Sequence, residues 1–205
     1  MAILAPHVSA AYVVMFLCKT LEQMVNKSSA LIEEKGSYEM LDIIHHLSAG
    51  FKAWWADYTY IAMDEMRQAC GGAGYHMASG VALTWKNGAP HPTHEGVNVV
   101  MMQQSSRLLL KQMKVLEQGK KCQGLMAYLN DLESLLNPKS RASTIEEYLD
   151  LDHLELALAT RSAYAFKLLQ GTLSRSSLPE KEKTNEAFAL DIDSAAKLHI
   201  EYLIV

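Results

Sequence analysis

Apolar residues recur along this chain with the three- and four-residue spacing of amphipathic helices. The spacing predicts helices over residues 6–26, 38–70, 97–118, 146–169 and 184–205. Runs that alternate apolar and polar residues, as half-buried strands do, are scarce. The pattern therefore predicts an all-α fold.

Two parts of the chain depart from this periodicity. Residues 71–93 are rich in glycine, contain both Pro90 and Pro92, and predict a long irregular loop, which in a compact domain is usually functional. The last residues, SAAKLHIEYLIV, form an apolar helix pattern without a helix stop signal. This ending predicts a fragment or a truncated isoform of a longer protein.

Composition narrows the classes of partner. Apolar residues make up 49% of the 205 residues, which is enough for a core, and the formal net charge of −4 provides no basic stripe for nucleic acid. The three cysteines form no CxxC pair and predict reduced thiols. The apolar run at residues 10–18 is too short to span a bilayer, so we expect a core helix there and no membrane span.

Glu95 is the candidate for chemistry. It lies in PTHEGVNVV and is the only carboxylate between Met66 and Leu116, a window that also carries five lysine or arginine residues. An acidic residue just before a helix also interacts favourably with the helix dipole. Glu95 is thus either an acid that caps a helix or a side chain that takes part in a reaction.

Two further patterns have simple structural interpretations. CGGAGY, residues 70–75, follows a helix rather than a strand, and its spacing alone favours a glycine-rich helix stop over a nucleotide-binding turn. His91, His94 and Glu95 form HxxHE rather than HExxH, and Pro92 prevents a regular helix through the pair. We therefore predict no metal site.

Longer segments carry a family resemblance. RQACGGAGYHMASG and PTHEGVNVVMMQQSSRLLLK resemble the C-terminal helical domain of the peroxisomal acyl-CoA oxidases, within the acyl-CoA dehydrogenase superfamily. PHVSAAYVVMF and IIHHLSAGFKAWW resemble the helices that precede it. The resemblance implies a helical bundle of the acyl-CoA dehydrogenase C-terminal type in residues 1–135. It also implies the start of a second helical domain in residues 136–205.

The resemblance implies a reaction as well. The family oxidises acyl-CoA to trans-2-enoyl-CoA with FAD during peroxisomal fatty acid β-oxidation, and molecular oxygen then becomes hydrogen peroxide. Glu95 matches the catalytic base that removes the α-proton, and the backbone N–H at this position helps to bind the thioester carbonyl. The absence of other carboxylates in the sequence around Glu95 would suit this role, because burial raises the pKa of a lone carboxylate and makes it the stronger base.

The family also binds FAD through residues that have counterparts here. Gln68, Gly71, Gly72 and Gly74 match a Q-x-x-GG-x-G segment that contacts the adenosine-diphosphate end of an FAD held mainly by the neighbouring subunit, which implies a homodimer. Gly96 and Asn98 match an EG-x-N segment beside the flavin.

The sequence also departs from the family pattern. His94, Val97 and Ala73 stand where the family usually has an aromatic residue, a polar residue and a histidine. Two alternatives therefore remain beside the oxidase. One is an acyl-CoA dehydrogenase with the same base and flavin, and the other is a non-catalytic helical module that dimerises with, or regulates, a full-length paralogue.

Overall fold

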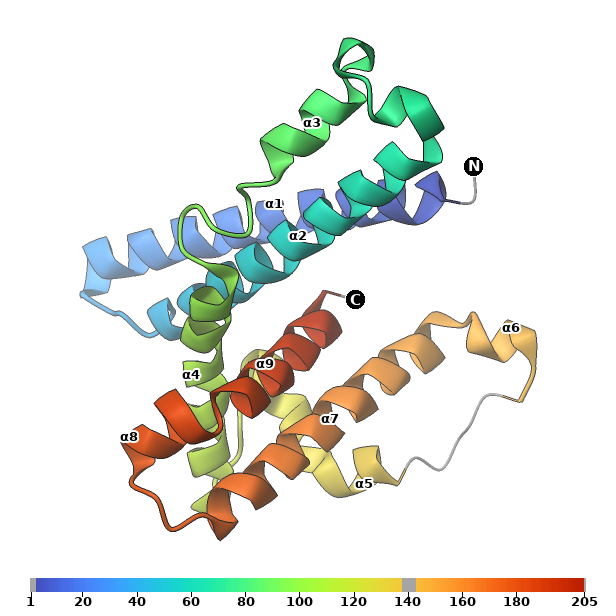
Figure 1. The fold of residues 1–205 in the computed structure, drawn as a ribbon. Helices are drawn as coiled ribbons and strands as arrows, with labels where there is room; N and C mark the ends of the chain where they lie inside the picture. Colours follow the sequence, from blue (N-terminus) through green and yellow to red (C-terminus); the bar gives the residue numbers. More distant parts are fainter. Residues whose placement is uncertain (1–2, 138–142, 205) are drawn as a thin grey trace. The chain divides into compact units, whose positions relative to one another are not determined.

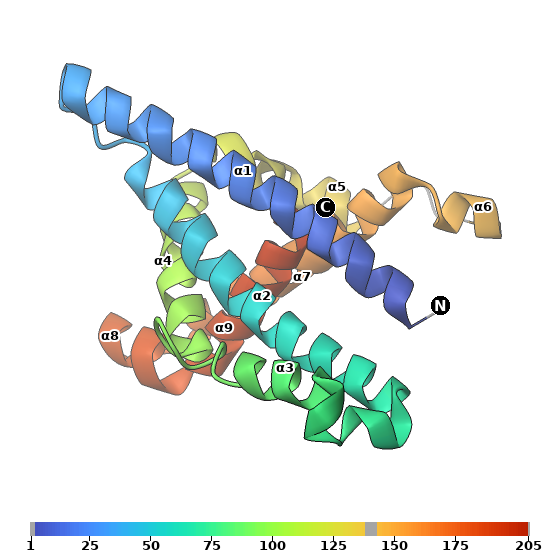
Figure 2. The same ribbon diagram turned by 90° about the horizontal axis from the view of Figure 1, so that it is seen from above.

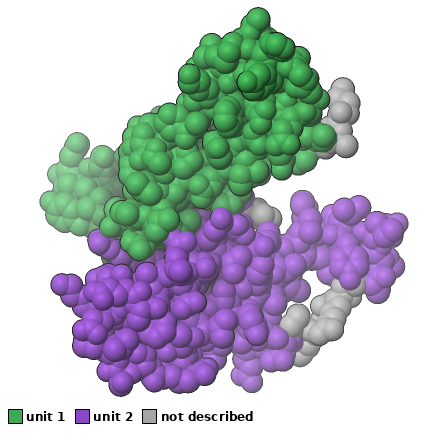
Figure 3. Space-filling view, in the orientation of Figure 1, with its two compact units in different colours: residues 1–104 green, residues 105–205 purple. Residues whose placement is uncertain are grey.

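The computed structural model describes residues 3–137 and 143–204. These residues form helices joined by turns and loops, and they contain no strand. The predicted all-α fold is confirmed. The helices belong to two compact units, residues 1–104 and residues 105–205 (Figure 3).

Unit 1 is built on a pair of long helices, α1 (Leu4–Lys35) and α2 (Leu41–Ala69), which lie along each other in opposite directions (Figures 1 and 2). Helix α1 is longer than predicted because, after Pro6 in its first turn, neither glycine nor proline occurs before Gly36. Gly36 ends it in a left-handed conformation with φ 62°, which glycine adopts at little cost.

Helix α1 is apolar on surfaces that the described residues leave open. Val8, Tyr12 and Phe16 are all exposed. By length and composition the whole helix could cross a membrane, although the apolar run at residues 10–18 within it is by itself too short. Core helices and N-terminal signal sequences meet the same two criteria, so this finding assigns no membrane role.

The glycine-rich stretch after α2 is more regular than predicted. It contains two short 3-10 turns, Gly71–Gly74 and Met77–Ser79, followed by helix α3 (Val81–Gly88), which packs on α2. A Cβ added at Gly88 would lie 2.5 Å from the sulfur of Met63. Gly88 thus allows α3 to approach α2 closely, although in the sequence it resembles a helix break.

Helix α4 (Asn98–Glu117) agrees with the helix predicted over 97–118, and it begins in unit 1 and ends in unit 2. Unit 2 continues with a 3-10 segment (Gly124–Asp131), α5 (Leu132–Leu136), α6 (Ile145–Tyr148), α7 (Leu151–Arg175), α8 (Glu180–Glu182), a π-helical turn (Lys183–Ala187) and α9 (Ala189–Leu203). Helices α7 and α9 lie side by side (Figures 1 and 2).

The core of unit 2 consists of buried apolar side chains from α4, the 3-10 segment, α7, α9 and the loop before the 3-10 segment. Its members are Leu109, Met113, Cys122, Met126, Leu129, Phe166, Leu169, Ile192 and Ala195. Burial raises the pKa of the Cys122 thiol. The amphipathic periodicity of the sequence therefore reflects one packed core in this unit.

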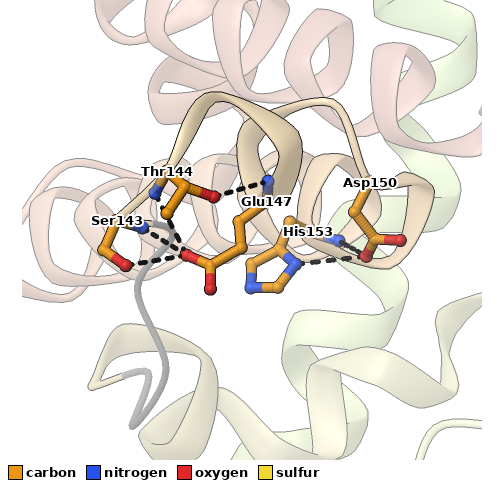
Figure 4. A network of polar contacts seen from close by, with 5 residues as sticks. All are labelled: Ser143, Thr144, Glu147, Asp150 and His153. Atoms are coloured by element: carbon orange, nitrogen blue, oxygen red, sulfur yellow. Dashed lines mark hydrogen bonds and ion pairs between the residues drawn. The ribbon is translucent and has the colours of Figure 1, made fainter.

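The helix predicted over 146–169 is interrupted, and side-chain caps cause the break (Figure 4). The Thr144 hydroxyl accepts a hydrogen bond from the Glu147 backbone N–H, and the Glu147 carboxylate accepts one from the Thr144 N–H. Asp150 then begins α7 by accepting from the His153 N–H at 3.3 Å. An N-cap residue has non-helical backbone angles, so Asp150 separates α6 from α7.

The remaining predicted bounds differ at the ends. The helix predicted over 184–205 begins only at Ala189, because the π-helical turn precedes it. Residue 205 and most of the connector predicted over 137–143 lie outside the described residues.

Candidate active site

Glu95 occupies an unusual backbone conformation in the loop before α4. Its φ is 57°, and it is the only described residue other than glycine with a positive φ. Two backbone bonds to the Pro90 carbonyl, from the N–H groups of Thr93 and His94, shape the preceding turn. The N–H of Asn98 closes the loop by donating to the Pro92 carbonyl at 3.0 Å.

This conformation carries a cost. A residue with a Cβ in the left-handed region costs about 1–2 kcal/mol relative to the right-handed helix region. Such strain persists only where the surroundings impose it, and it gathers at functional sites. The next residue, Gly96, has φ 106°, and a Cβ there would lie 2.6 Å from the Met101 sulfur. The Glu95–Gly96 turn is therefore held by tight local packing.

Glu95 lines an open cavity of about 260 Å³ within unit 1. The cavity is formed by one face of α2 and by the loop, namely Lys52, Trp55, Ala56, Thr59, His91, His94 and Glu95. The α2 residues follow the i, i+3, i+4, i+7 spacing of a single helix face. Glu95 is exposed, so the described residues do not supply the dry surroundings expected from the sequence.

Lys52 and Asp57 connect this loop to α2, and sequence reasoning missed both. The Lys52 ammonium donates to the Gly96 carbonyl at 2.7 Å and to Asn98 Oδ1 at 2.8 Å. Asn98 Nδ2 donates to Asp57 Oδ1 at 2.6 Å and to the Ala53 carbonyl at 3.1 Å. A carboxylate from α2 thus lies close to the loop, although the sequence around Glu95 lacks one.

These contacts also place Asn98, which we predicted to lie beside a flavin. Its side chain is buried, and its oxygen and nitrogen are both bonded to α2. A cofactor contact by Asn98 stays a prediction, and it would have to use the backbone rather than the amide.

The predicted adenosine-diphosphate contacts lie at the other end of α2. Gly71 has φ 55°, and a Cβ at Gly71 or Gly72 would meet no atom within 4 Å. Gly74 differs, because its Cβ would lie 1.9 Å from the Arg67 carbonyl oxygen. Gly74 therefore has the structural role expected of a helix stop, while the backbone of Gly71 and Gly72 is open to approach.

Gln68 is held by a neighbour on the same helix. Its Nε2 donates to Asp64 Oδ2 at 2.6 Å, and Arg67 Nε donates to Asp64 Oδ1 at 3.0 Å. These bonds lower the pKa of the Asp64 carboxyl below its ordinary value, and the bond from Arg67 has the largest effect. The Arg67 guanidinium in turn lies over the Trp85 ring, 5.1 Å from its centroid.

The structure does not bring the two predicted contact regions together. Trp55 and Gln68 lie thirteen positions apart in the helix, which corresponds to roughly 20 Å along α2. The Glu95 cavity and the glycine turn are thus two separate surfaces of unit 1.

The histidines near Glu95 lie close to each other. The His91 and His94 rings are 5.0 Å apart between centroids. Among residues 3–137 and 143–204, no group of three or more His, Cys, Asp or Glu side chains is arranged to hold a metal ion.

Comparisons with known proteins give consistent results. Residues 1–110 match the family model described as acyl-CoA oxidase, C-alpha1 domain. Peroxisomal acyl-coenzyme A oxidase 1 of Mus musculus is 32% identical over 209 residues, which cover 98% of this chain and 31% of the mouse protein. The chain therefore spans less than a third of that relative.

Solved structures agree with this similarity. The acyl-CoA oxidase of tomato, Lycopersicon esculentum, superposes with a TM-score of 0.88 at 27% identity, over 97% of this chain and 30% of that chain. Acyl-CoA oxidase-1 of Caenorhabditis elegans, solved in complex with FAD and ATP, superposes with a TM-score of 0.76 at 23% identity, over 97% of this chain and 30% of that one.

Proposed function

Because the chain belongs to the acyl-CoA oxidase family, we propose that it carries the base-bearing part of an enzyme that oxidises acyl-CoA to trans-2-enoyl-CoA. In the complete reaction the substrate loses a proton from its α-carbon and a hydride from its β-carbon. Molecular oxygen accepts the two electrons and leaves as hydrogen peroxide. The mouse relative is a peroxisomal enzyme, which supports a peroxisomal location.

Glu95 takes the α-proton in this proposal. The observation that carries it is the presentation of Glu95, which lines an open cavity from a left-handed turn. In this arrangement the carboxylate would reach a space lined by Trp55 and Thr59, where an acyl thioester would lie. The backbone N–H of Glu95 would stabilise the negative charge that develops on the thioester carbonyl.

FAD fits the glycine turn of this chain. The backbone at Gly71 and Gly72 is uncovered, so a nucleotide can approach it closely. Gln68 at the end of α2 would add a contact to the same nucleotide, and the backbone of Gly96 and Asn98 would contact the flavin of a second FAD. When bound, FAD supplies the acceptor for the hydride. We infer a homodimer, because the glycine turn and the Glu95 cavity are separate surfaces that would contact different FAD molecules.

The test is Glu95→Gln in the FAD-loaded enzyme that contains this chain. We expect flavin reduction by acyl-CoA to slow by about 10²- to 10⁴-fold, the usual contribution of a general base, with flavin content unchanged. Glu117→Gln, an exposed acid on α4, is the matched control and should reduce flavin at the wild-type rate. If the flavin of Glu95→Gln is bleached by acyl-CoA at the wild-type rate in stopped flow, Glu95 is not the base.

A helical module without catalysis is the second candidate, and the exposed apolar side chains of α1 favour it. A peroxide assay separates the two functions, because a module would form complexes but produce no peroxide. An acyl-CoA dehydrogenase, the remaining alternative, would reduce its flavin but require an acceptor other than oxygen.

A further inference from the structure

All three hydrogen-bond donors of the Lys52 ammonium are taken up by the segment that carries Glu95. An ammonium has three donors, and those of Lys52 go to the carbonyls of His91 and Gly96 and to the Asn98 side-chain oxygen. The distances from Nζ are 3.2, 2.7 and 2.8 Å, in that order. Bonds with one charged partner are among the stronger hydrogen bonds in proteins.

The three acceptors enclose Glu95 along the chain. His91 lies in the loop before Glu95, Gly96 follows Glu95 directly, and Asn98 is the first residue of α4. Asn98 adds a second link, because its amide nitrogen bonds to Asp57 and to the Ala53 carbonyl on α2. The strained turn is therefore attached to α2 both before and after the carboxylate.

Resting on the proposed function, we propose that Lys52 is the positioning residue that holds Glu95 in its left-handed turn and so directs the base toward the substrate. The bonds from Lys52 go to neutral oxygens, so its donors are used without an ion pair to the Glu95 carboxylate. Loss of the ammonium leaves the Gly96 carbonyl without this partner and lets the Glu95–Gly96 turn relax toward ordinary backbone angles.

The first measurement is hydrogen exchange on the 205-residue chain carrying Lys52→Met, which keeps the length of the side chain but removes its donors. The amides of Thr93, His94 and Asn98 are hydrogen bonded within the loop and report its opening. We expect them to exchange about tenfold faster or more. Lys86→Met, at an exposed lysine on α3, is the matched control and should leave them unchanged. Unchanged exchange in Lys52→Met would overturn the proposal.

The second measurement separates positioning from simple support of the fold. In the FAD-loaded enzyme, Lys52→Met should lower kcat on the order of 10²-fold, the effect of a base displaced by about 1 Å, with KM and flavin content nearly unchanged. Faster exchange with an unchanged kcat would overturn the proposal, because Lys52 would then only support the loop.

Glu95→Gln distinguishes this proposal from the proposed function. It should lose kcat while its loop amides exchange as in the wild type. A normal kcat in Glu95→Gln would remove the base assignment, whereas the exchange of Lys52→Met tests by itself whether Lys52 holds the loop. Should Lys52→Met fail to fold, Lys52→Arg carries the test. Its planar guanidinium keeps the charge but cannot direct three donors from one nitrogen. Wild-type exchange and kcat in Lys52→Arg would likewise overturn the proposal.

Discussion

At the scale of single residues, Gly72 and Gly74 are two positions apart but have opposite surroundings. A Cβ on Gly72 would point into open space, whereas one on Gly74 would lie 1.9 Å from the backbone oxygen of Arg67. A backbone atom at the end of α2 cannot move aside as the tip of a flexible side chain can. The same substitution should therefore have different effects at the two positions.

We expect Gly72→Val to retain the helicity and denaturant midpoint of the wild type but to lower FAD occupancy, because its side chain fills the space that a nucleotide would enter. Gly74→Val should cost about 1–3 kcal/mol of stability or more through overpacking. Circular dichroism in urea and flavin absorbance after FAD titration measure the two effects. A lowered denaturant midpoint with full FAD occupancy in Gly72→Val would make the whole turn a structural stop.

At the scale of elements, the junction of α6 and α7 depends on carboxylates in their charged form (Figure 4). Hydrogen bonds from Ser143 hold the pKa of the Glu147 carboxyl below its ordinary value of 4.5. A hydrogen bond from the His153 side chain, and then one from its backbone, lowers the pKa of Asp150 below 3.8. Both shifts follow from bonds that only the charged carboxylate accepts fully.

The Asp150 cap should therefore weaken in acid. Because the pKa of Asp150 is lower in the folded chain, the unfolded segment takes up its proton first. The cap contributes fully above the ordinary value of 3.8 and is lost as pH falls through the lowered pKa. NMR signals of residues 143–153 should show the first turn of α7 fraying over this range. Asp150→Asn keeps a good N-cap and should abolish this pH dependence. Equal fraying in the wild type and in Asp150→Asn would contradict the role of the Asp150 carboxylate.

At the scale of the whole molecule, the two units differ in what they bury. Unit 2 encloses large side chains such as Phe166 and Leu109, whereas the buried positions of α2 in unit 1 are mainly alanine. The units divide after residue 104, within α4, and the family match ends at residue 110. The evolutionary domain boundary predicted after residue 135 stays a prediction.

Phe166→Ala tests the core of unit 2. Phe166 is 1% exposed, and its truncation should cost about 3–5 kcal/mol through lost burial and a cavity. Leu168→Ala on the same helix is the control, because Leu168 is 58% exposed and should change stability by about 0.5 kcal/mol or less. Urea unfolding followed by far-ultraviolet circular dichroism measures both. Equal shifts in the two variants would show that α7 does not anchor a core at Phe166.

The order of residues was enough to predict the helical class, the long helices and the segment that carries Glu95. These features depend on local periodicity and on short motifs, which the order of residues contains directly. The helix over Val81–Gly88 was missed because its terminal glycine, needed for close contact with Met63, is indistinguishable in sequence from a helix break.

The way in which the Glu95 loop is held depends on contacts between distant parts of the chain. Lys52 and Gly96 are 44 positions apart, and no periodicity of either segment indicates that one side chain reaches the other. The same holds for the contrast between Gly72 and Gly74, which depends on where the end of α2 lies. Contacts of this kind depend on how helices and loops pack in space, so a one-dimensional pattern predicts the groups that are available but not the partners they find.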